Sequence, residues 1–445
     1  MNREKYIHIK EFIRELVKDT EWEGHVFVVG GCVRDDLMGL DIKDIDLCVS
    51  FPCGGVRFAE WLRDKGHTME SVTTYPSFGT AMLHLKSFPE DELEFVQTRK
   101  EKYTDRSSRN PETVFGSIED DCMRRDLTIN ALYENISTGE LVDITGKGVE
   151  DIKNHIIRTP NEPDIIFDDD PLRILRCVRF ASRYGWKIEK ATYYGMVRNV
   201  DRLQIIAKER IRDEFDKMLT CRHPVMAMEL LRETNAMHYV LPEMEKTYDM
   251  GQNDFHFGTV WEHTLAVMDH LKSDRLELRM AALLHDIGKI RVRSVEGAKV
   301  HFLKHELASA EMVDELLRPL HYSNDFINEV AFLVKHHMTC KAWGYECEQM
   351  KSKKLRKLQY ICGTEKRFRD LMFLIDADNN AHAVDTCMPR QVEVILQRTE
   401  EMKNAGTAMF GYKLPLTGKD VMEIKGLKPG LEVKECLSYT HPLFR

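Results

Sequence analysis

Long apolar runs are missing from this chain of 445 residues. No uncharged stretch approaches the about 18 residues that a membrane-spanning helix needs. The N-terminal segment MNREKYIHIKEFIREL mixes acids with bases and does not predict a signal peptide. Eleven cysteines are present but never as a Cys-x-x-Cys pair, which argues against zinc fingers or a disulfide framework and favours reduced thiols. We therefore expect a cytoplasmic protein without a membrane partner, and nothing in the sequence identifies a protein partner.

An excess of positive charge is also missing. The net charge of −9 argues against a protein that coats nucleic acid indiscriminately, so any contact with nucleic acid must come from a local basic surface. The composition, 43% hydrophobic and 31% charged, is that of an ordinary globular protein. The length is sufficient for two or three domains.

The first informative segment is VVGGCVRDDLMGLDIKDIDLCV, residues 28–49. An apolar strand ends at a pair of glycines, whose missing Cβ atoms let backbone N–H groups approach an anionic ligand. A plain strand-to-helix turn would explain the glycines but not the charged pair that follows them. The segment therefore predicts a nucleotide-binding turn made by Gly30, Gly31, Arg34 and Asp35.

Two carboxylates close the same segment. Residues i and i+2 of a strand project to one face, so Asp44 and Asp46 are expected side by side while Ile45 and Leu47 point into the core. Hard oxygen ligands of this kind suit Mg²⁺ and leave room for substrate phosphates. A bare Asp-x-Asp is usually a solvated edge pair, but the preceding glycines favour a two-metal site.

Two arginine-rich segments follow. Within residues 119–132, Arg125, Asp126 and Asn130 combine a guanidinium suited to phosphate with side chains able to hold ribose hydroxyls. Beyond it, Asp168-Asp169-Asp170-Pro171 predicts a helix start. The alternative to a binding surface is that the arginines that follow form an ordinary solvated helix face. At 100° per residue, one arc of this helix carries Arg173, Arg176, Arg179 and Arg183.

The second half of the chain carries a separate set of histidines and acids on apolar, helix-like segments. Imidazole and carboxylate together suit a transition metal or Mg²⁺ that activates water against a phosphoryl group. The alternative is a structural metal or a decayed site. The set consists of His263, His285, Asp286, His305, His336, His337 and Asp376.

Together, GGxVRD with DxD, RRDxxxNAL and an acidic segment leading into LRxxRF resemble the class II tRNA nucleotidyltransferases, the family of CCA-adding enzymes and bacterial poly(A) polymerases. The histidine set is similar to the HD phosphohydrolase superfamily. This resemblance implies that the core metal ligands are His263, His285, Asp286 and Asp376, with His305, His336 and His337 as possible additions. These resemblances imply an α/β polymerase-β-like head with a mixed sheet (1–155), a helical neck (156–215), an all-helical HD body (216–400) and a C-terminal region (401–445). The chain stops at THPLFR, earlier than expected, so we expect an altered or truncated terminus.

The family resemblance also implies roles for residues. Asp44 and Asp46 would hold the metals, Gly31 and Arg34 would contact the triphosphate, and Asp170 with Arg173 would read the incoming base. Asp169 stands where the family usually has Glu. Three acids are the common complement of this chemistry, and Glu94 is the candidate for the third, with Asp91 and Glu92 as competitors.

The implied activity is addition of CMP and AMP to the 3′ end of tRNA, with tRNA, CTP and ATP as partners. A poly(A) polymerase or a partial adder of CC or A shares every motif. An HD phosphohydrolase with a nucleotide-sensing head, and an RNA-binding structural module, are the alternatives of another class. The polar, turn-rich segment 99–111 is predicted to be a loop.

Overall fold

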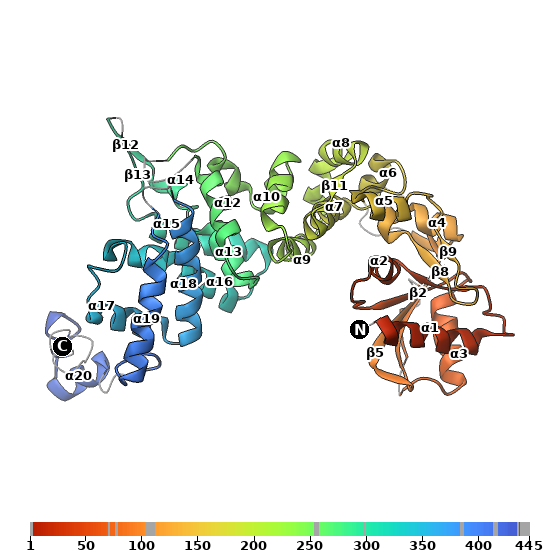
Figure 1. Cartoon of the computed structure of the whole chain (residues 1–445), viewed down its shortest axis with the longest axis horizontal. Coiled ribbons are helices and arrows are strands. Elements are labelled where there is room, and N and C mark those ends of the chain that lie inside the picture. The colour runs from red at the N-terminus through yellow and green to blue at the C-terminus, as the bar shows by residue number, and fades with distance from the viewer. Residues whose placement is uncertain are drawn as a thin grey trace. The chain divides into compact units, whose positions relative to one another are not determined.

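The computed structural model describes residues 3–69, 72–75, 79–102, 112–252, 258–297, 299–382, 387–412, 417–433 and 436. Its contacts divide the chain into two compact units, Met1–Val240 and Leu241–Arg445 (Figure 1). Each unit is considered by itself. The predicted neck boundary at residue 215 falls inside the first unit, so head and neck residues share it. None of the described helices is both long and apolar enough to cross a membrane.

The first unit is built on a seven-stranded sheet with the order β3-β4-β5-β2-β1-β8-β9. Strands β2 and β5 are parallel, and the other neighbours are antiparallel. The predicted mixed sheet is therefore confirmed. The strands are β1 (Val26–Val29), β2 (Ile45–Val49), β3 (Thr73–Tyr75), β4 (Thr80–Leu85), β5 (Phe88–Gln97), β8 (Tyr133–Asn135) and β9 (Leu141–Val142).

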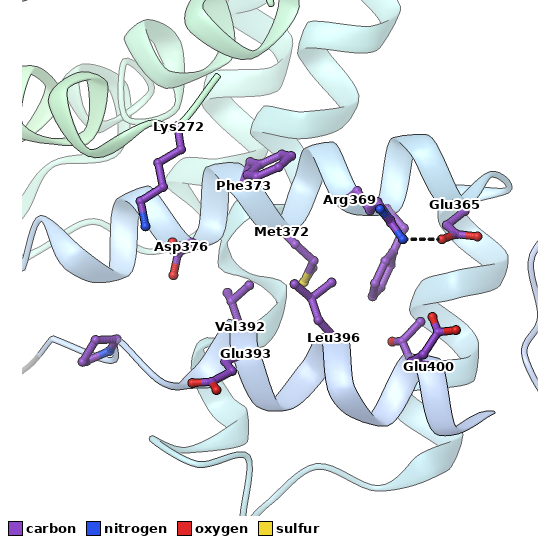
Figure 2. Close-up of a pocket in the computed structure, with 13 residues that line it drawn as sticks. Lys272, Glu365, Arg369, Met372, Phe373, Asp376, Val392, Glu393, Leu396 and Glu400 are labelled. Atoms are coloured by element: carbon purple, nitrogen blue, oxygen red, sulfur yellow. Dashed lines mark hydrogen bonds and ion pairs between the residues drawn. The ribbon is translucent and has the colours of Figure 1, made fainter. Parts of the chain in front are cut away.

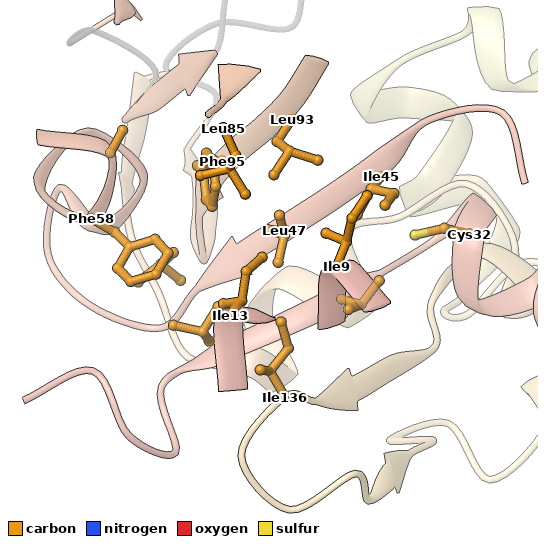
Figure 3. Close-up of a cluster of buried hydrophobic side chains, with 14 of the residues drawn as sticks. Ile9, Ile13, Cys32, Ile45, Leu47, Phe58, Leu85, Leu93, Phe95 and Ile136 are labelled. Atoms are coloured by element: carbon orange, nitrogen blue, oxygen red, sulfur yellow. The ribbon is translucent and has the colours of Figure 1, made fainter. Parts of the chain in front are cut away.

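Alternation along the strands gives the sheet two different faces. One face is covered by helices α1 (Arg3–Val17) and α3 (Gly54–Asp64), whose apolar residues share a core with Ile45, Leu47 and Phe95 (Figure 3). Residues one position along the same strands, among them Asp46 and Glu94, must point to the opposite face. The predicted burial of Ile45 and Leu47 is confirmed, and it places Asp46 on the face away from α1 and α3.

The remainder of the first unit is mainly helical. Residues 99–102, predicted as part of a loop, instead form a strand paired with residues 112–115, and the intervening residues 103–111 lie outside the described part. The helices are α2 (Gly31–Leu37), α4 (Ile118–Met123), α5 (Gly148–Asn154), α6 (Pro163–Asp169), α7 (Leu172–Tyr184), α8 (Lys190–Asn199), α9 (Lys208–Leu219), α10 (Pro224–Glu233), α11 (Met237–Val240) and the 3₁₀ turns η2 (Thr128–Asn130) and η3 (Val200–Ile205). The two small strand pairs are β6 (Arg99–Lys102) with β7 (Glu112–Phe115), and β10 (Ile156–Ile157) with β11 (Lys187–Ile188).

The acidic triplet before α7 has a different local structure from the one predicted. Asp168 and Asp169 end the preceding helix α6, and Asp170 alone is extended between the two helices. Its carboxylate accepts a hydrogen bond from the Leu172 backbone N–H (3.1 Å), which satisfies one of the unpaired donors at the start of α7. Asp170 therefore lies at the beginning of the helix that carries the arginines.

The second unit is helical with one short hairpin, β12 (Ser294–Glu296) with β13 (Lys299–His301). Helix α19 crosses the predicted boundary at residue 400. The helices are α12 (Val260–His270), α13 (Leu276–Leu284), α14 (Lys289–Val292), α15 (His305–Leu317), α16 (Asn324–His336), α17 (Ser352–Cys362), α18 (Glu365–Asn380), α19 (Gln391–Asn404), α20 (Gly418–Lys425) and the 3₁₀ turns η4 (Pro242–Thr247), η5 (Arg318–Leu320) and η6 (His337–Trp343).

Candidate active site and candidate metal centre

A cleft of about 320 Å³ lies within the first unit, between the open face of the sheet and the start of α7. Seven predicted site residues line it, together with arginines that the local motifs did not single out, Arg99 and Arg210. The other predicted residues of this unit lie outside the cleft wall. The predicted lining residues are Asp46, Glu94, Arg125, Asp126, Asp170, Arg173 and Arg176.

Acidic side chains from two neighbouring strands meet in this cleft. The parallel register pairs Asp46 of β2 directly with Glu94 of β5. Burial raises the pKa of Asp46, and the nearby Asp44 carboxylate adds to the increase while Arg125 opposes it. Burial and then the Asp46 carboxylate raise the pKa of Glu94. Repulsion between half-buried carboxylates is the electrostatic signature of a site that a cation would stabilise.

Asp44 is placed less regularly than predicted. Strand β2 begins at Ile45, so Asp44 precedes the strand, and its side chain is exposed. It still lies close enough to both Asp46 and Glu94 to raise their pKa values. Asp91, a competitor for the third acid, is instead paired with Lys5 (2.5 Å).

The arginines of the RRD segment are held by a buried acid. Asp121 is fully buried and accepts hydrogen bonds from Arg124, Arg125 and the Tyr133 hydroxyl (2.6 Å). These partners outweigh the burial that would raise its pKa, and they hold the pKa of Asp121 well below its usual range. Arg125 is thereby fixed beside Asp46 with its charge retained. No local motif singled out Asp121, although it stands three and four residues before the two arginines.

Asp126 joins the head to helix α7. Its carboxylate accepts from Arg176 Nε (2.7 Å) and from the Asn130 side-chain amide (3.1 Å), which confirms that Asp126 and Asn130 lie together. Burial would raise the pKa of Asp126, but Arg176 and Asn130 lower it to about 2. The carboxylate is therefore ionised at neutral pH.

The glycine turn leads into helix α2, and the Arg34 backbone N–H donates to the Gly30 carbonyl (3.1 Å). Gly30 has φ +77°, a conformation that other residues adopt at a cost, and a Cβ there would lie 3.3 Å from Arg125 Nη1. Arg34 is only 4% exposed and donates to Asp35 (2.8 Å) and to the Asn130 side-chain oxygen. Arg34 thus lies behind the cleft rather than in its wall.

The predicted base-reading pair lines the cleft, but its two members have different partners. Arg173 is buried and donates to the Ile166 carbonyl (3.1 Å), with Asp169 at 4.0 Å. Asp170 accepts from Arg210 (2.9 Å). The third arginine of the predicted face, Arg179, is buried against Glu214 (2.5 Å). The predicted arginine face is therefore mostly an interior, paired face, and only part of it faces the cleft.

The second unit gathers most of the predicted histidines around two buried acids, Asp286 and Asp378. The Asp286 carboxylate lies 3.2 Å from His285 Nε2 and 3.1 Å from His305 Nε2. His263 Nε2 lies 3.6 Å from Asp286 and 3.2 Å from Asp378, and His337 Nε2 lies 3.9 Å from Asp286. Within the described residues, three sets have ligand atoms within 4.8 Å of one another: His263, His285, Asp286; His263, Asp378, His382; and Asp286, His305, His337.

The orientation of these imidazoles fits a metal centre. Nδ1 of His285, His305 and His337 lies 2.8, 2.9 and 2.6 Å from the carbonyl oxygens of Ala282, Phe302 and Val334. A carbonyl only accepts, so Nδ1 carries the proton and a neutral ring directs its Nε2 lone pair inward. The described donor set of imidazole nitrogens and carboxylates suits a divalent transition metal.

Two residues predicted for this centre, Asp376 and the possible addition His336, lie outside the described cluster. Asp376 lies in a different place, a pocket of about 560 Å³ between α18 and α19 that Lys272 also lines (Figure 2). Asp378, two residues on, is the buried acid of the cluster, because a step of two residues turns a helix by about 200°. His336 is half-buried and packs on Phe332 (4.6 Å between ring centroids), whereas His337 faces Asp286.

Three other residues complete the centre and were not predicted. Lys289 lies 2.7 Å from Asp286, and Lys341 lies 2.9 Å from Asp378. His382 Nδ1 lies 2.6 Å from the Asp378 carbonyl and follows it by one helical turn. Helical spacing could have found Asp378 and His382, since Leu371, Leu374, Asp378 and His382 recur at intervals of three or four residues.

Comparison with known proteins places these observations in a family. Models for a poly A polymerase head domain, for the "probable RNA and SrmB- binding site of polymerase A" and for an HD domain match residues 26–158, 185–247 and 255–363. The multifunctional CCA protein of Chromobacterium violaceum is 32% identical over 326 residues, covering 70% of this chain and 74% of that protein. The chain belongs to the CCA tRNA nucleotidyltransferase family.

The fungal relatives match a smaller part of the chain. The mitochondrial CCA tRNA nucleotidyltransferase of Saccharomyces cerevisiae is 35% identical over 226 residues, and the match covers 47% of this chain and 40% of that protein. The chain thus spans less than half the length of the first fungal relatives that it matches. The Bacillus stearothermophilus CCA-adding enzyme in complex with CTP has the same fold, with a TM-score of 0.63 at 23% identity over 93% of this chain and 87% of that chain. Nucleotidyltransferases and HD domains of these families use divalent metals.

Proposed function

We propose that this protein adds CMP and AMP to the 3′ end of tRNA without a nucleic-acid template. The 3′-hydroxyl attacks the α-phosphorus of CTP or ATP, and pyrophosphate leaves. The observation that carries the proposal is the single cleft in which Asp46 and Glu94 face Arg125 and Arg173. Acids for cations, guanidinium groups for phosphates and a polar pair for the base are the parts that phosphoryl transfer of this kind requires.

The sheet acids are the proposed ligands of Mg²⁺. Asp44, Asp46 and Glu94 supply hard oxygen donors, and the raised pKa values of Asp46 and Glu94 fit a site completed by cations. When bound, the ions neutralise phosphate charge and increase the acidity of the attacking hydroxyl. Arg125, held in its charged form by Asp121, is proposed to bind the triphosphate.

The sugar and the base are assigned to residues next to α7. Asp126 and Asn130 offer an acceptor and a donor for ribose hydroxyls. Asp170 accepts from an exocyclic amino group while Arg173 donates to a ring acceptor. Cytosine and adenine both present an amino donor beside a ring-nitrogen acceptor, so one protein template serves CTP and ATP and excludes uracil and guanine. Arg176 supports this arrangement through Asp126.

One assay separates this proposal from its nearest alternatives. The substrate is a tRNA that ends at its discriminator base, supplied with CTP, ATP or both. Addition of two CMP residues and then one AMP supports full CCA synthesis. Incorporation of CMP alone or a single AMP alone identifies a partial adder, and a long AMP tract identifies a poly(A) polymerase. Any of these three results contradicts the proposal of full CCA addition. An absence of incorporation leaves an HD phosphohydrolase with a nucleotide-sensing head, or a structural RNA-binding module.

A second activity is proposed for the other unit, a metal-dependent phosphohydrolase. Its support is the cluster of His263, His285, Asp286 and Asp378, with His305 and His337 on the far side of Asp286. A divalent metal bound there would activate water for attack on phosphorus. The test is hydrolysis of bis-p-nitrophenyl phosphate with Mn²⁺, Ni²⁺ or Mg²⁺, comparing the wild type with Asp286→Asn. Equal rates in both would contradict the proposal.

We also propose that the protein is located in the cytoplasm. The cysteines are free in the structure, which agrees with a reducing environment such as the cytoplasm.

A further inference from the structure

The guanidinium of Arg34 lies against two aromatic rings of helix α7. Its guanidinium carbon lies 5.1 Å from the centre of the Phe180 ring and 5.6 Å from that of Tyr184. The two rings are stacked with 6.1 Å between their centroids. A desolvated guanidinium over aromatic faces is a favourable cation–π arrangement, and Arg34 is almost completely buried. We call Arg34, Phe180 and Tyr184 the aromatic clamp.

The polar edge of the clamp closes a ring of hydrogen bonds that begins and ends on α7. Arg176 donates to Asp126, and the Asn130 amide donates to the same carboxylate. Arg34 donates to Asn130 and to Asp35. The Tyr184 hydroxyl donates to Asp35 (3.4 Å) and returns the ring to the helix. Arg176 and Tyr184 are about 12 Å apart along the helix axis, so α7 is fastened to the head at two points.

This double attachment has a consequence for the nucleotide site. Asp170 and Arg173 lie at the N-terminal end of α7, while Arg34 lies on helix α2 directly after the glycine turn, where its backbone N–H donates to the Gly30 carbonyl (3.1 Å). The distance between base reader and glycine turn is therefore set by how α7 is attached. A single attachment through Arg176 would let the helix pivot, whereas the second attachment at Tyr184 prevents rotation. Positioning of this kind is what nucleotidyl transfer depends on.

We infer that Tyr184 is a positioning residue for nucleoside triphosphate binding, which acts through Arg34 and Asp35 without touching the nucleotide. This inference rests on the proposed function of the head. The triphosphate is common to CTP and ATP, so loss of the aromatic clamp weakens the binding of both nucleotides by the same factor. Discrimination against UTP, which depends on Asp170 and Arg173, is unchanged.

The experiment compares Tyr184→Leu and Tyr184→Phe with the wild-type full chain. Equilibrium CTP binding without RNA, and KM and kcat for CTP and for ATP, are measured for each protein. Tyr184→Leu removes the ring and the hydroxyl and is expected to raise both KM values and the CTP dissociation constant about tenfold, while kcat changes less than about threefold. Tyr184→Phe removes only the hydroxyl and is expected to raise both KM values and the CTP dissociation constant about threefold. The matched control is Tyr194→Leu on α8, where the tyrosine is half exposed.

Each result decides the inference. Wild-type binding and KM in Tyr184→Leu overturn it, as does a change in CTP-to-UTP selectivity with unchanged KM. If Tyr184→Leu loses its native circular dichroism, Tyr184→Phe decides, and unchanged constants there overturn the inference. A double-mutant cycle with Arg34→Lys adds a second criterion, because strictly additive effects on CTP binding contradict coupling through Arg34. Failure of the wild type to bind CTP contradicts the proposed function instead.

Discussion

Asp46 and Glu94 stand opposite each other on the parallel strands β2 and β5, and the Asp46 carboxylate adds to the effect of burial in raising the pKa of Glu94. Both project from the sheet face away from the helix-covered core. A protein retains such repulsion where function requires it, since neutral side chains would be more favourable at both positions.

Neutralising either acid is expected to separate activity from stability. Asp46→Asn should lower CMP incorporation roughly a thousandfold or more, because the principal charge at the reacting phosphate is lost. The raised pKa of Asp46 means that its ionised form costs folding free energy at neutral pH, so Asp46→Asn should melt at or above the wild-type temperature. Incorporation assays and thermal melts check the two expectations. Glu92→Gln, one pleat earlier on β5, is the control and should keep wild-type incorporation. An active Asp46→Asn contradicts the metal assignment.

Removal of the base-reading side chain of Arg173 should change the selectivity between nucleotides more than the affinity for the triphosphate. Arg173→Ala is expected to lower discrimination between CTP and UTP at least about tenfold, since one or two hydrogen bonds to the base are lost. Competition between the two nucleotides for one tRNA primer measures this ratio. Arg198→Ala, an exposed arginine paired with Asp164, should leave the ratio unchanged. Unchanged selectivity in Arg173→Ala would mean that the template lies elsewhere.

The alternation of residues along the strands predicts which side chains of the first unit face the core and which face the site. In the second unit, the helical periodicity of α18 is the better guide to the residues of the metal centre. A period of two residues along β2 predicts that Ile45 and Leu47 face the core and that Asp46 faces the open side of the sheet. These placements are confirmed. The resemblance to the HD superfamily implies Asp376, whereas the buried face of α18 favours Asp378. That face contains Leu374 and Asp378.

The networks behind the cleft could not be predicted in the same way. Asp121 binds Arg125 over one helical turn, which a sequence could suggest, but the Tyr133 hydroxyl joins them only because β8 lies beside β1. The ring from Arg176 to Tyr184 combines residues of three separate segments. Such contacts depend on tertiary placement, which local periodicity does not specify.

The two neighbouring acids of α18 offer a matched test of the metal centre. Asp378→Asn should weaken binding of Mn²⁺ or Ni²⁺ to the second unit at least about tenfold, because a buried carboxylate beside His263 is lost. Asp376→Asn, on the other side of the same helix, should bind like the wild type. Calorimetric titration of the metal-stripped full chain, in the background of Asp46→Asn to remove head sites, measures both. Equal affinities in the two variants would exclude Asp378 as a ligand.

The ion pair between Asp126 and Arg176 should be visible in the pH dependence of stability. The folded-state pKa of Asp126 is about 2, below the usual value of 3.8, so its ionised form stabilises the fold above about pH 4 and this contribution is lost as the pH falls toward 2. The shift corresponds to about 2 kcal/mol for a buried pair. Asp126→Asn should therefore show a large loss of melting temperature at pH 6 and a smaller one at pH 3. Asp164→Asn removes an exposed pair and should show little loss at either pH. A deficit in Asp126→Asn that is the same at both pH values would show that Asn fails there for steric reasons and that the charge on Asp126 does not hold α7 to the head.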